Sequence, residues 1–202
     1  ILEPGLEIST VQHGCSIAIS PDGQKVAMVA IRNGQSNLYL RQARNASWRQ
    51  IPNTVEAENP VFSSRSERLY FNDKEGLKAV SIVDNTIEKI TDQNANGVAS
   101  GDGFSVISTG YAAGLSFLDS LNGNEKKLTT LDYSAPDRGD REFAHFWPQL
   151  MPDAKHVIFT SFLAELDKSS IKLCSVNGGE QVTIIENAIF GRYLDSGYLV
   201  FI

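Results

Sequence analysis

A short turn followed by an apolar strand pattern recurs along this chain, and the recurrence limits the folds open to it. In "ISPDGQKVAMVA", residues 19–30, Pro21 presets φ, Asp22 can bond its own backbone and Gly23 can take the left-handed conformation. The later residues that take the place of Asp22 are Arg65, Asp102, Asp153 and Ser196, with Gly103 and Pro152 as further turn residues. Successive copies lie 43, 37, 51 and 43 residues apart.

Each turn is followed by a second strand, turn and strand. The four segments with this pattern are "SNLYLRQARNASWRQIP" (36–52), "GLKAVSIVDNTIEKIT" (76–91), "AGLSFLDSLNGNEKKLT" (113–129) and "SSIKLCSVNGGEQVTII" (169–185). Asn, Asp and Gly at their centres are suited to tight hairpins because they tolerate positive φ. One unit is therefore predicted to contain four short antiparallel strands.

Four strands repeated about every 40–45 residues are typical of a β-propeller. A single four-stranded sheet cannot cover its apolar faces, so neighbouring blades stack on them. In the first unit Val26, Met28 and Ala30 can line one face while Ala27 and Val29 line the other. The chain is therefore predicted to be all-β, one propeller fragment over 1–202. Its predicted blades are 11–52, 57–92, 95–130, 144–186 and an incomplete one at 187–202.

The repeat "ISPDGQKVAMVA" followed by "NLYLRQ" resembles the TolB-type, WD-repeat-like propeller repeat. A longer part resembles the propeller region carried C-terminally by many bacterial serine/threonine protein kinases. In that family one blade opens with a Trp-Pro-Gln-apolar-apolar-Pro-Asp segment and the next with Tyr-Leu-x-x-Gly-Tyr-Leu-apolar-Phe. The residues here that match the two segments are Trp147, Pro148, Gln149, Pro152 and Asp153, then Tyr193, Leu194, Gly197, Tyr198, Leu199 and Phe201. Ala154 stands where that family usually has Gly.

The resemblance implies a sensing or interaction module outside the cytoplasm, because in such kinases the propeller usually lies beyond a membrane helix. The sequence shows no kinase motif: it lacks the Gly-rich loop, His-Arg-Asp and Asp-Phe-Gly. Any kinase activity would belong to another part of the polypeptide.

The charge and composition of the chain argue against some classes of partner and location. The formal net charge of −6 argues against nucleic acid as the main partner, since phosphate binding needs a basic face. No apolar run approaches the ~20 residues of a membrane helix, and no signal peptide is visible. Cys15 and Cys174 lack metal or redox spacing and are interpreted as free thiols, with a disulfide between them left open.

The predicted ring is open, which leaves apolar faces and strand edges without a neighbour. Two copies are expected to pair through these ends as a homodimer. The alternative is that the N-terminal "LEISTV" pairs with the C-terminal strands and closes a small ring.

The longest predicted connection, "DYSAPDRGDREFAHFW" (132–147), is the candidate contact site for a protein or a small ligand, because long loops on rigid scaffolds often carry binding. The proposed contact residues are Asp137, Arg138, Asp140, Arg141, His145 and Trp147, beside Phe143 and Phe146. The alternative is a solvated loop that its aromatic residues anchor.

No catalytic, metal or cofactor motif is found. His13, His145 and His156 are scattered without ligand spacing, and there is no Gly-x-Ser-x-Gly nucleophile elbow. A Ser-His-Asp triad assembled by the fold stays open. The leading hypothesis is a non-enzymatic binding or sensor module. The rival is the substrate-gating propeller of a prolyl-oligopeptidase-like serine peptidase whose catalytic domain lies elsewhere.

Overall fold

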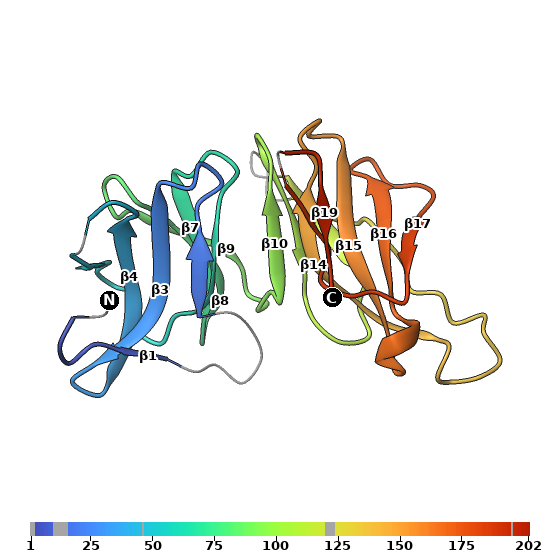
Figure 1. Cartoon of the computed structure of the whole chain (residues 1–202), viewed down its shortest axis with the longest axis horizontal. Helices are drawn as coiled ribbons and strands as arrows, with labels where there is room; N and C mark the ends of the chain where they lie inside the picture. The colour runs from blue at the N-terminus through green and yellow to red at the C-terminus, as the bar shows by residue number, and fades with distance from the viewer. Residues whose placement is uncertain (1–2, 10–15, 46, 120–123, 195) are drawn as a thin grey trace. The chain divides into compact units, whose positions relative to one another are not determined.

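The computed structural model describes residues 3–9, 16–45, 47–119, 124–194 and 196–202 (Figure 1). These residues form two compact units, 1–94 and 95–202. The first unit contains two sheets. The second contains two further sheets and a hairpin. His13 and Cys15, and the predicted turn at Asn122-Gly123, lie outside the described residues.

The sheets of the first unit correspond to the first two predicted blades. The first consists of β1 (Glu7–Ile8), β2 (Ile17–Ile19), β3 (Lys25–Arg32), β4 (Gln35–Gln42) and β5 (Arg49–Gln50). The second consists of β6 (Glu58–Phe62), β7 (Arg68–Asp73), β8 (Gly76–Ser81) and β9 (Ile87–Thr91). All their strand pairs are antiparallel.

The second unit repeats the pattern. Its third sheet consists of β10 (Gly97–Ser100), β11 (Phe104–Ser108), β12 (Leu115–Asp119) and β13 (Glu125–Lys127). The fourth consists of β14 (Glu142–Leu150), β15 (His156–Leu163), β16 (Ser170–Ser175) and β17 (Val182–Glu186), with the short helix η1 (Leu166–Lys168) between β15 and β16. A hairpin of β18 (Arg192–Tyr193) and β19 (Leu199–Val200) follows. The all-β, partial β-propeller fold predicted from the repeat is confirmed.

The sheets differ from the predicted pattern in two places. The first sheet has five strands, because β1 and β2 both pair with β3, at Ala30–Ile31 and at Val26–Met28. The described part of the N-terminal segment, Glu7–Ile8, is thus a strand of the first sheet. The fourth sheet begins at Glu142, so the connection before it is shorter than the predicted 132–147.

The core of each unit lies between its sheets, as burial of two-sided blades requires. In the first unit Ala27, Val29 and Leu38 pack with Leu69 and Phe71 of the second sheet. The opposite face of the first sheet, with Met28, Ala30 and Tyr39, packs under Leu6. In the second unit the third and fourth sheets share a core that contains Val106, Leu115, Val157 and Phe159.

The recurrent turn keeps one backbone feature in all five copies. The third turn residue has positive φ each time: Gly23 at 66°, Ser66 at 57°, Gly103 at 77°, Ala154 at 54° and Gly197 at 89°. Where Asp22 is present, its side chain accepts a hydrogen bond from the Gln24 N–H, 2.9 Å. A second bond is common to the first two copies: the Ser20 hydroxyl accepts from the Lys25 N–H at 2.8 Å, and the Ser63 hydroxyl accepts from the Arg68 N–H at 3.0 Å. The backbone of the turn is thus retained although its sequence has changed.

Candidate functional site

The connection between β13 and β14 is anchored at its base by Glu142. The Asp132 N–H donates to the Glu142 carboxylate at 2.6 Å, and the Glu142 N–H donates back to the Asp132 carbonyl at 3.1 Å. Within the loop, Arg141 Nε donates to the Ala135 carbonyl at 2.7 Å. The loop therefore has a fixed base and an internal support.

The tip of this loop is charged and exposed. Asp140 forms an ion pair with Lys168 of η1 at 2.7 Å, and Lys168 also pairs with Glu165. The hydrogen bonds that Lys168 donates to these two carboxylates, above all to Asp140, raise the pKa of Lys168 well above its usual range. Asp137 accepts the Gly139 N–H at 2.8 Å. Arg138 is exposed, with no side-chain partner among the described residues.

His145 and Trp147 do not belong to the loop but to β14. The His145 side chain is fully buried, with Thr129 Oγ1 at 2.7 Å from Nδ1 and Glu142 Oε2 at 3.2 Å from Nε2. A contact between His145 and a partner would need this strand to open. Trp147 is partly exposed.

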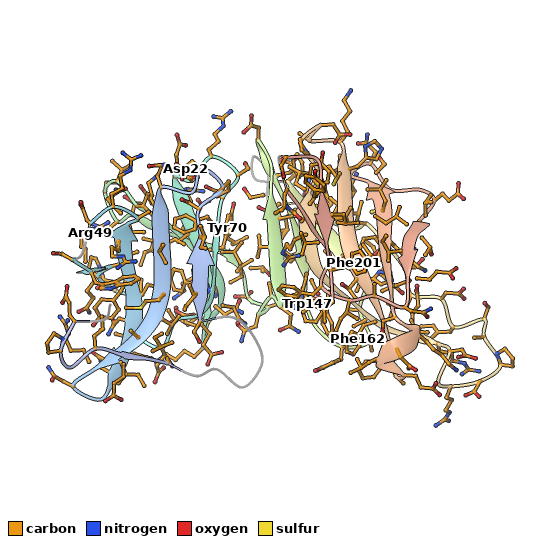
Figure 2. The ribbon with its side chains drawn as sticks, in the orientation of Figure 1. Asp22, Arg49, Tyr70, Trp147, Phe162 and Phe201 are labelled. Carbon is orange, nitrogen blue, oxygen red and sulfur yellow. The ribbon has the colours of Figure 1, made fainter. Side chains whose placement is uncertain are left out.

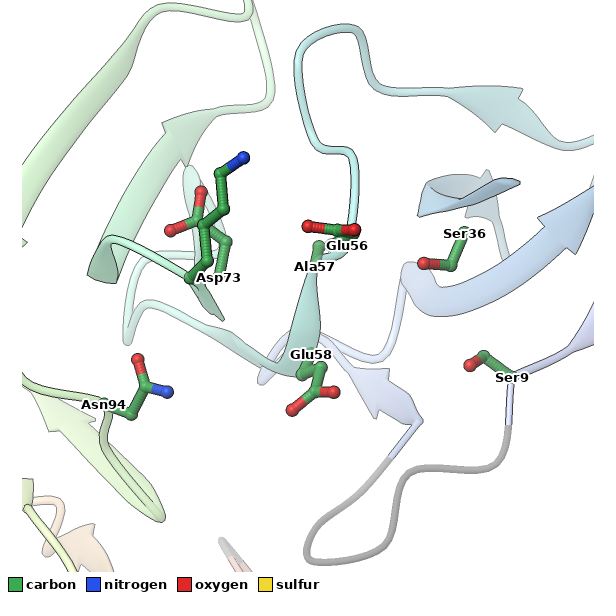
Figure 3. A pocket seen from close by; sticks show the side chains of 8 residues that line it. Ser9, Ser36, Glu56, Ala57, Glu58, Asp73 and Asn94 are labelled. Atoms are coloured by element: carbon green, nitrogen blue, oxygen red, sulfur yellow. The ribbon is translucent and has the colours of Figure 1, made fainter. Parts of the chain in front are cut away.

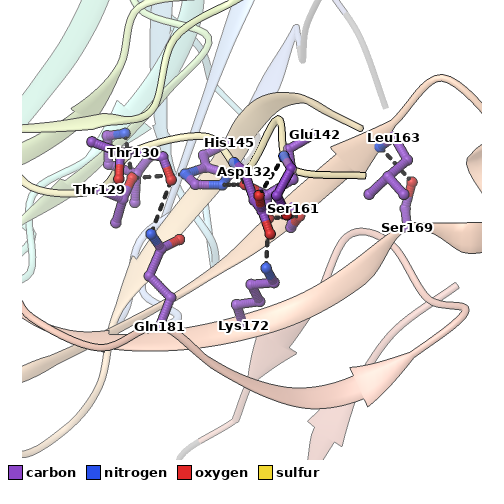
Figure 4. A network of polar contacts seen from close by, with 12 residues as sticks. Thr129, Thr130, Asp132, Glu142, His145, Ser161, Leu163, Ser169, Lys172 and Gln181 are labelled. Atoms are coloured by element: carbon purple, nitrogen blue, oxygen red, sulfur yellow. Dashed lines mark hydrogen bonds and ion pairs between the residues drawn. The ribbon is translucent and has the colours of Figure 1, made fainter. Parts of the chain in front are cut away.

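Glu142 is the centre of a buried polar network that no motif in the sequence predicts (Figure 4). Its carboxylate accepts hydrogen bonds from Ser161 Oγ, 2.7 Å, and from Lys172 Nζ. Burial acts to raise the pKa of Glu142. The hydrogen bonds from His145, Lys172, Ser161 and the Asp132 N–H outweigh burial and hold that pKa well below its usual range. The network thus keeps Glu142 ionised at the base of the loop.

The network has a hydroxyl, an imidazole and a carboxylate, which are the groups of a catalytic triad. However, Ser161 donates to Glu142 rather than to His145, and the Thr129 hydroxyl already accepts the Leu115 N–H at 2.7 Å. Thr129, Glu142, His145 and Ser161 are 3%, 5%, 0% and 0% exposed. In this geometry both hydroxyls are buried, and the groups connect Leu115 of the third sheet with β14 of the fourth at the base of the loop.

Beside the loop lies an aromatic cluster. Its members are Tyr111, Phe143, Phe146, Trp147, Phe162 and Phe190. Phe146, only 5% exposed, is central: its ring centroid lies 5.4 Å from Tyr111, 5.6 Å from Trp147 and 5.5 Å from Phe162. Tyr111 and Phe143 are 58% and 44% exposed, so this end of the cluster faces solvent.

A β-bulge in β14 allows two successive residues to join the cluster. The pairing with β15 shifts register between Phe146 and Gln149, and Trp147 has φ of 52°. Successive side chains of a regular strand point to opposite faces, and a bulge changes this alternation. The Arg192 guanidinium donates to the Trp147 carbonyl at 3.0 Å and lies over the Phe190 ring.

The cluster is built at one end of the strands. Tyr111 lies between β11 and β12, Phe143 at the start of β14, Phe162 near the end of β15, and Phe190 between β17 and β18. Figure 2 shows Trp147 and Phe162 close together in this part of the unit. Phe143, Phe146 and Trp147 lie in the connection predicted from the sequence. Tyr111, Phe162 and Phe190 do not, because only the fold brings those segments together.

The charged segments beside the cluster are acidic on balance. The exposed or partly exposed charged residues of the loop and of the η1 segment are Asp132, Asp137, Arg138, Asp140, Arg141, Glu165, Asp167 and Lys168. Five carboxylates against three cations give a formal charge of −2. The side chains at this end therefore combine exposed aromatic surface with a negative potential.

A concave site lies within the first unit (Figure 3). A pocket of about 430 Å³ is lined by Ser9, Ser36, Glu56, Ala57, Glu58, Asp73, Lys74 and Asn94. No motif in the sequence pointed to it. One of its carboxylates, Asp73, is already paired with Lys78 at 2.7 Å. The pocket therefore has less unpaired negative charge than its composition implies.

The described residues contain no group of three His, Cys, Asp or Glu side chains arranged to hold a metal ion. His156 is exposed and pairs with Asp153 at 2.6 Å.

Cys174 is a free thiol in the described part of the chain, and burial raises its pKa to about 11. Within the same ranges, no helix has the length and apolar content needed to cross a bilayer.

Known protein sequences and known structures give different results when compared with this chain. No protein-family profile and no curated protein sequence matches the chain. The structure is similar to a putative TolB from Agrobacterium tumefaciens, with a TM-score of 0.69 at 15% identity over 96% of this chain and 78% of the other. It is also similar to TolB from Acinetobacter baumannii, with a TM-score of 0.64 at 15% identity over 85% of this chain.

The chain spans only 43% of the Acinetobacter protein. A puromycin-hydrolyzing peptidase from Mycobacterium tuberculosis is similar too, with a TM-score of 0.58 at 14% identity over 90% of this chain and 30% of the peptidase. These similarities confirm a TolB-like β-propeller fold.

Proposed function

We propose that this chain, with its TolB-like propeller fold, is a non-enzymatic binding module that contacts a protein partner through the aromatic cluster. The observation that carries the proposal is the set of six contacting rings, with Tyr111 and Phe143 more than 40% exposed beside a supported loop. The partner segment is extended and carries both apolar and basic side chains.

The chemistry of the cluster supports a peptide segment. Aromatic side chains contribute much of the binding energy at protein interfaces, since Tyr and Trp bury a large area at low cost in conformational entropy. Here Phe146 and its neighbours hold the exposed rings of Tyr111 and Phe143 in fixed positions before binding. A preorganised surface of this kind loses little conformational freedom when a partner binds.

The charge of the neighbouring segments supports basic residues in the partner. The formal charge of −2 on the loop and η1 segment attracts Lys and Arg, and exposed aromatic faces bind such cations by cation–π interaction. The buried state of Thr129, Glu142 and His145 supports a structural role for the polar groups beneath this surface rather than a catalytic one.

The test uses two fluorescein-labelled peptides, one of alternating Lys and Trp and a twin with Glu in place of Lys. By fluorescence anisotropy the Lys peptide is expected to bind, more weakly at high salt, and the Glu peptide at least ~10-fold more weakly. Tyr111→Ala and Phe143→Ala are each expected to weaken binding of the Lys peptide about 10-fold. Val83→Ala, which truncates another exposed apolar residue, is the control.

Equal binding of the two peptides would contradict the basic partner. Unchanged binding in both aromatic variants would contradict the site. Turnover of a substrate by the purified chain, abolished by changes in one pocket, would contradict the non-enzymatic role itself.

We also propose a wider setting, on the resemblance to bacterial receptor kinases: the module acts as their extracytoplasmic sensor. The reading frame around the chain tests this proposal. A kinase domain and a membrane helix encoded before residue 1 would support it, and their absence from the reading frame would contradict it.

A second candidate is the substrate-gating propeller of a serine peptidase. The similarity to the puromycin-hydrolyzing peptidase favours it, because this chain matches 30% of that longer protein. A hydrolase domain with a nucleophile elbow encoded after residue 202 would select this candidate over the sensor.

A further inference from the structure

The pocket of the first unit is built from the same kinds of segment as the aromatic cluster of the second. Strand ends and connections supply its lining: the start of β4 with Ser36, the start of β6 with Glu58, the end of β7 with Asp73 and the β9–β10 connection with Asn94. The corresponding strand ends and connections of the second unit carry Tyr111, Phe143, Phe162 and Phe190. The repeat thus forms a site from equivalent segments in each unit, with polar side chains in the first and aromatic rings in the second.

The main chain around Ala57 is held by hydrogen bonds. The Glu56 N–H donates to the Ser36 carbonyl of the first sheet at 3.1 Å, and the Ala57 N–H donates to the Thr54 carbonyl at 3.3 Å. Figure 3 shows Ala57, which is 1% exposed, between Glu56 and Glu58. A methyl group fills little space, so the carboxylates on either side border a pocket of about 430 Å³. Pockets of about 300–1,000 Å³ are typical of small-molecule sites.

The β7–β8 hairpin brings an unpaired cation to the pocket. Lys78 pairs with Asp73 at 2.7 Å and with Glu75 at 2.5 Å, so the carboxylates of the hairpin already have a cationic partner. Lys74 lines the pocket, is exposed, and takes part in no ion pair within the described ranges. The hairpin itself is closely packed, because a Cβ on Gly76 would lie 2.3 Å from a main-chain carbonyl oxygen of β9. Lys74 therefore reaches the pocket from a supported hairpin, with its ammonium group available to a ligand.

The unpaired charges of the lining are of both signs. Glu56 and Glu58 are exposed, and neither forms an ion pair with any residue that the structure describes. With Lys74 they give two unpaired carboxylates and one unpaired ammonium group. Ser36 and Asn94 add a hydroxyl and an amide, which both donate and accept hydrogen bonds. A ligand that matches this lining carries two cationic groups and one anionic group.

We propose that this pocket binds a free basic amino acid, such as lysine or ornithine. The two ammonium groups of the ligand pair with the carboxylates of Glu56 and Glu58, and its carboxylate pairs with Lys74. Hydrogen bonds between ionised partners are about twice as strong as neutral ones, and complementary charge suppresses the binding of wrong ligands. The site is separate from the aromatic cluster and does not depend on the peptide partner proposed there.

Other charged ligands match the lining less well. A diamine without a carboxylate leaves Lys74 unpaired beside two further cationic groups. A dicarboxylic amino acid places a second anion near Glu56 or Glu58. A neutral amino acid leaves one of these carboxylates without a partner. Because like charges held close together are unfavourable, each of these ligands is expected to bind more weakly than lysine.

Two-dimensional ¹H–¹⁵N NMR tests the proposal, because it gives both the affinity and the residues in contact. L-lysine is expected to shift the main-chain amide signals of Glu56, Ala57 and Asn94 with a dissociation constant below ~1 mM. Cadaverine, which lacks the carboxylate, and L-norleucine, which lacks the side-chain ammonium group, should each bind at least ~10-fold more weakly. The amide signals of Tyr111 and Phe143 in the second unit should not move.

Lys74→Gln separates the contributions of the two ends of the ligand. It should weaken L-lysine binding at least ~10-fold and should not weaken cadaverine binding, because cadaverine has no carboxylate for Lys74 to bind. Glu58→Gln should weaken the binding of both ligands. Lys155→Gln and Glu180→Gln, at exposed positions of the second unit, are the matched controls and should bind L-lysine like the unsubstituted chain.

Three results would overturn the proposal. The first is the absence of shifts at Glu56, Ala57 and Asn94 up to ~20 mM L-lysine. The second is equal affinity for L-lysine, cadaverine and L-norleucine. The third is a loss of cadaverine binding in Lys74→Gln as large as the loss of L-lysine binding. None of these results would affect the peptide binding proposed at Tyr111 and Phe143, which the anisotropy experiment tests separately.

Discussion

The side-chain amide of Gln149 and the main chain of Tyr193 are joined by two reciprocal hydrogen bonds. Gln149 Nε2 donates to the Tyr193 carbonyl at 2.9 Å, and the Tyr193 N–H donates to Gln149 Oε1 at 2.8 Å. The amide thus behaves like a strand neighbour and connects β14 to β18. This contact gives a physical reason for the glutamine of the Trp147-Pro148-Gln149 segment.

Gln149→Ala is expected to loosen the C-terminal hairpin. The change leaves the N–H and C=O of Tyr193 without their partner, at a cost of about 1–3 kcal/mol in local stability. Hydrogen exchange of the Tyr193 amide should therefore accelerate about 10-fold or more. Gln42→Ala removes an exposed glutamine from β4 and should leave this rate unchanged. Equal protection in both variants would contradict the role of Gln149.

Ala154→Gly is expected to stabilise the chain. Ala154 has φ of 54°, a conformation that costs a residue with a Cβ about 1–2 kcal/mol and glycine little. Part of this gain is lost to the greater flexibility of unfolded Gly, so a net increase of about 0.5–1 kcal/mol is expected in urea unfolding. Ala43→Gly, at an exposed turn residue without positive φ, should show no gain.

Glu142→Gln is expected to destabilise the chain in a pH-dependent way. The carboxylate has a lowered pKa in the folded state, so its stabilisation is complete above the unfolded pKa of about 4.3 and declines as the pH falls below it. At pH 7 the variant leaves Lys172 without its ion pair, at a cost of about 3–5 kcal/mol.

Urea unfolding at pH 7, 5 and 3.5 measures this loss. The difference in unfolding free energy between the unsubstituted chain and the Glu142→Gln variant should be similar at pH 7 and 5 and smaller at pH 3.5. Glu180→Gln, at an exposed position, is the control and should change little at any pH. A difference that does not vary with pH would show that the charge of Glu142 is not what stabilises the network.

Within the aromatic cluster, the buried ring of Phe146 should contribute mainly to stability and the exposed ring of Tyr111 mainly to peptide binding. Phe146 is 5% exposed and lies at the centre of the cluster. Phe146→Ala is therefore expected to lower the free energy of unfolding by about 3–5 kcal/mol. Tyr111 is 58% exposed, so Tyr111→Ala should lower the free energy of unfolding by less than about 1 kcal/mol. Thermal and urea unfolding check both. A large loss at Tyr111 would mean that its ring supports the fold, and that its effect on peptide binding is indirect.

Cys174 is expected to react slowly with thiol reagents in the folded chain. It is 2% exposed, and its pKa of about 11 leaves little thiolate at pH 8. In a Cys15→Ser background, labelling by iodoacetamide should be at least ~100-fold faster after addition of denaturant. Rapid labelling of the native protein would contradict the burial of Cys174.

The sequence predicted the repeat better than it predicted the site. The spacing of Asp22, Asp102 and Asp153 was sufficient for the propeller, since turn residues and strand patterns are local properties of the chain. The loop residues Asp137 to Arg141 were placed correctly in a connection, whereas His145 was predicted there and lies buried in β14. The bulges in β14 interrupt the alternation of apolar and polar residues, so the sequence pattern did not show that this strand begins at Glu142.

By itself, the sequence of this protein determined the kind of unit, its period and the position of its turns, because these depend on neighbouring residues and on backbone preferences. Only the tertiary structure decided that Tyr111 meets Phe143, that Lys172 meets Glu142 and that the N-terminal strand joins β3. Such contacts join residues from separate strands and turns. Their geometry follows from sheet register, the bulge at Trp147 and burial of the apolar faces, and none of these is written in any single segment.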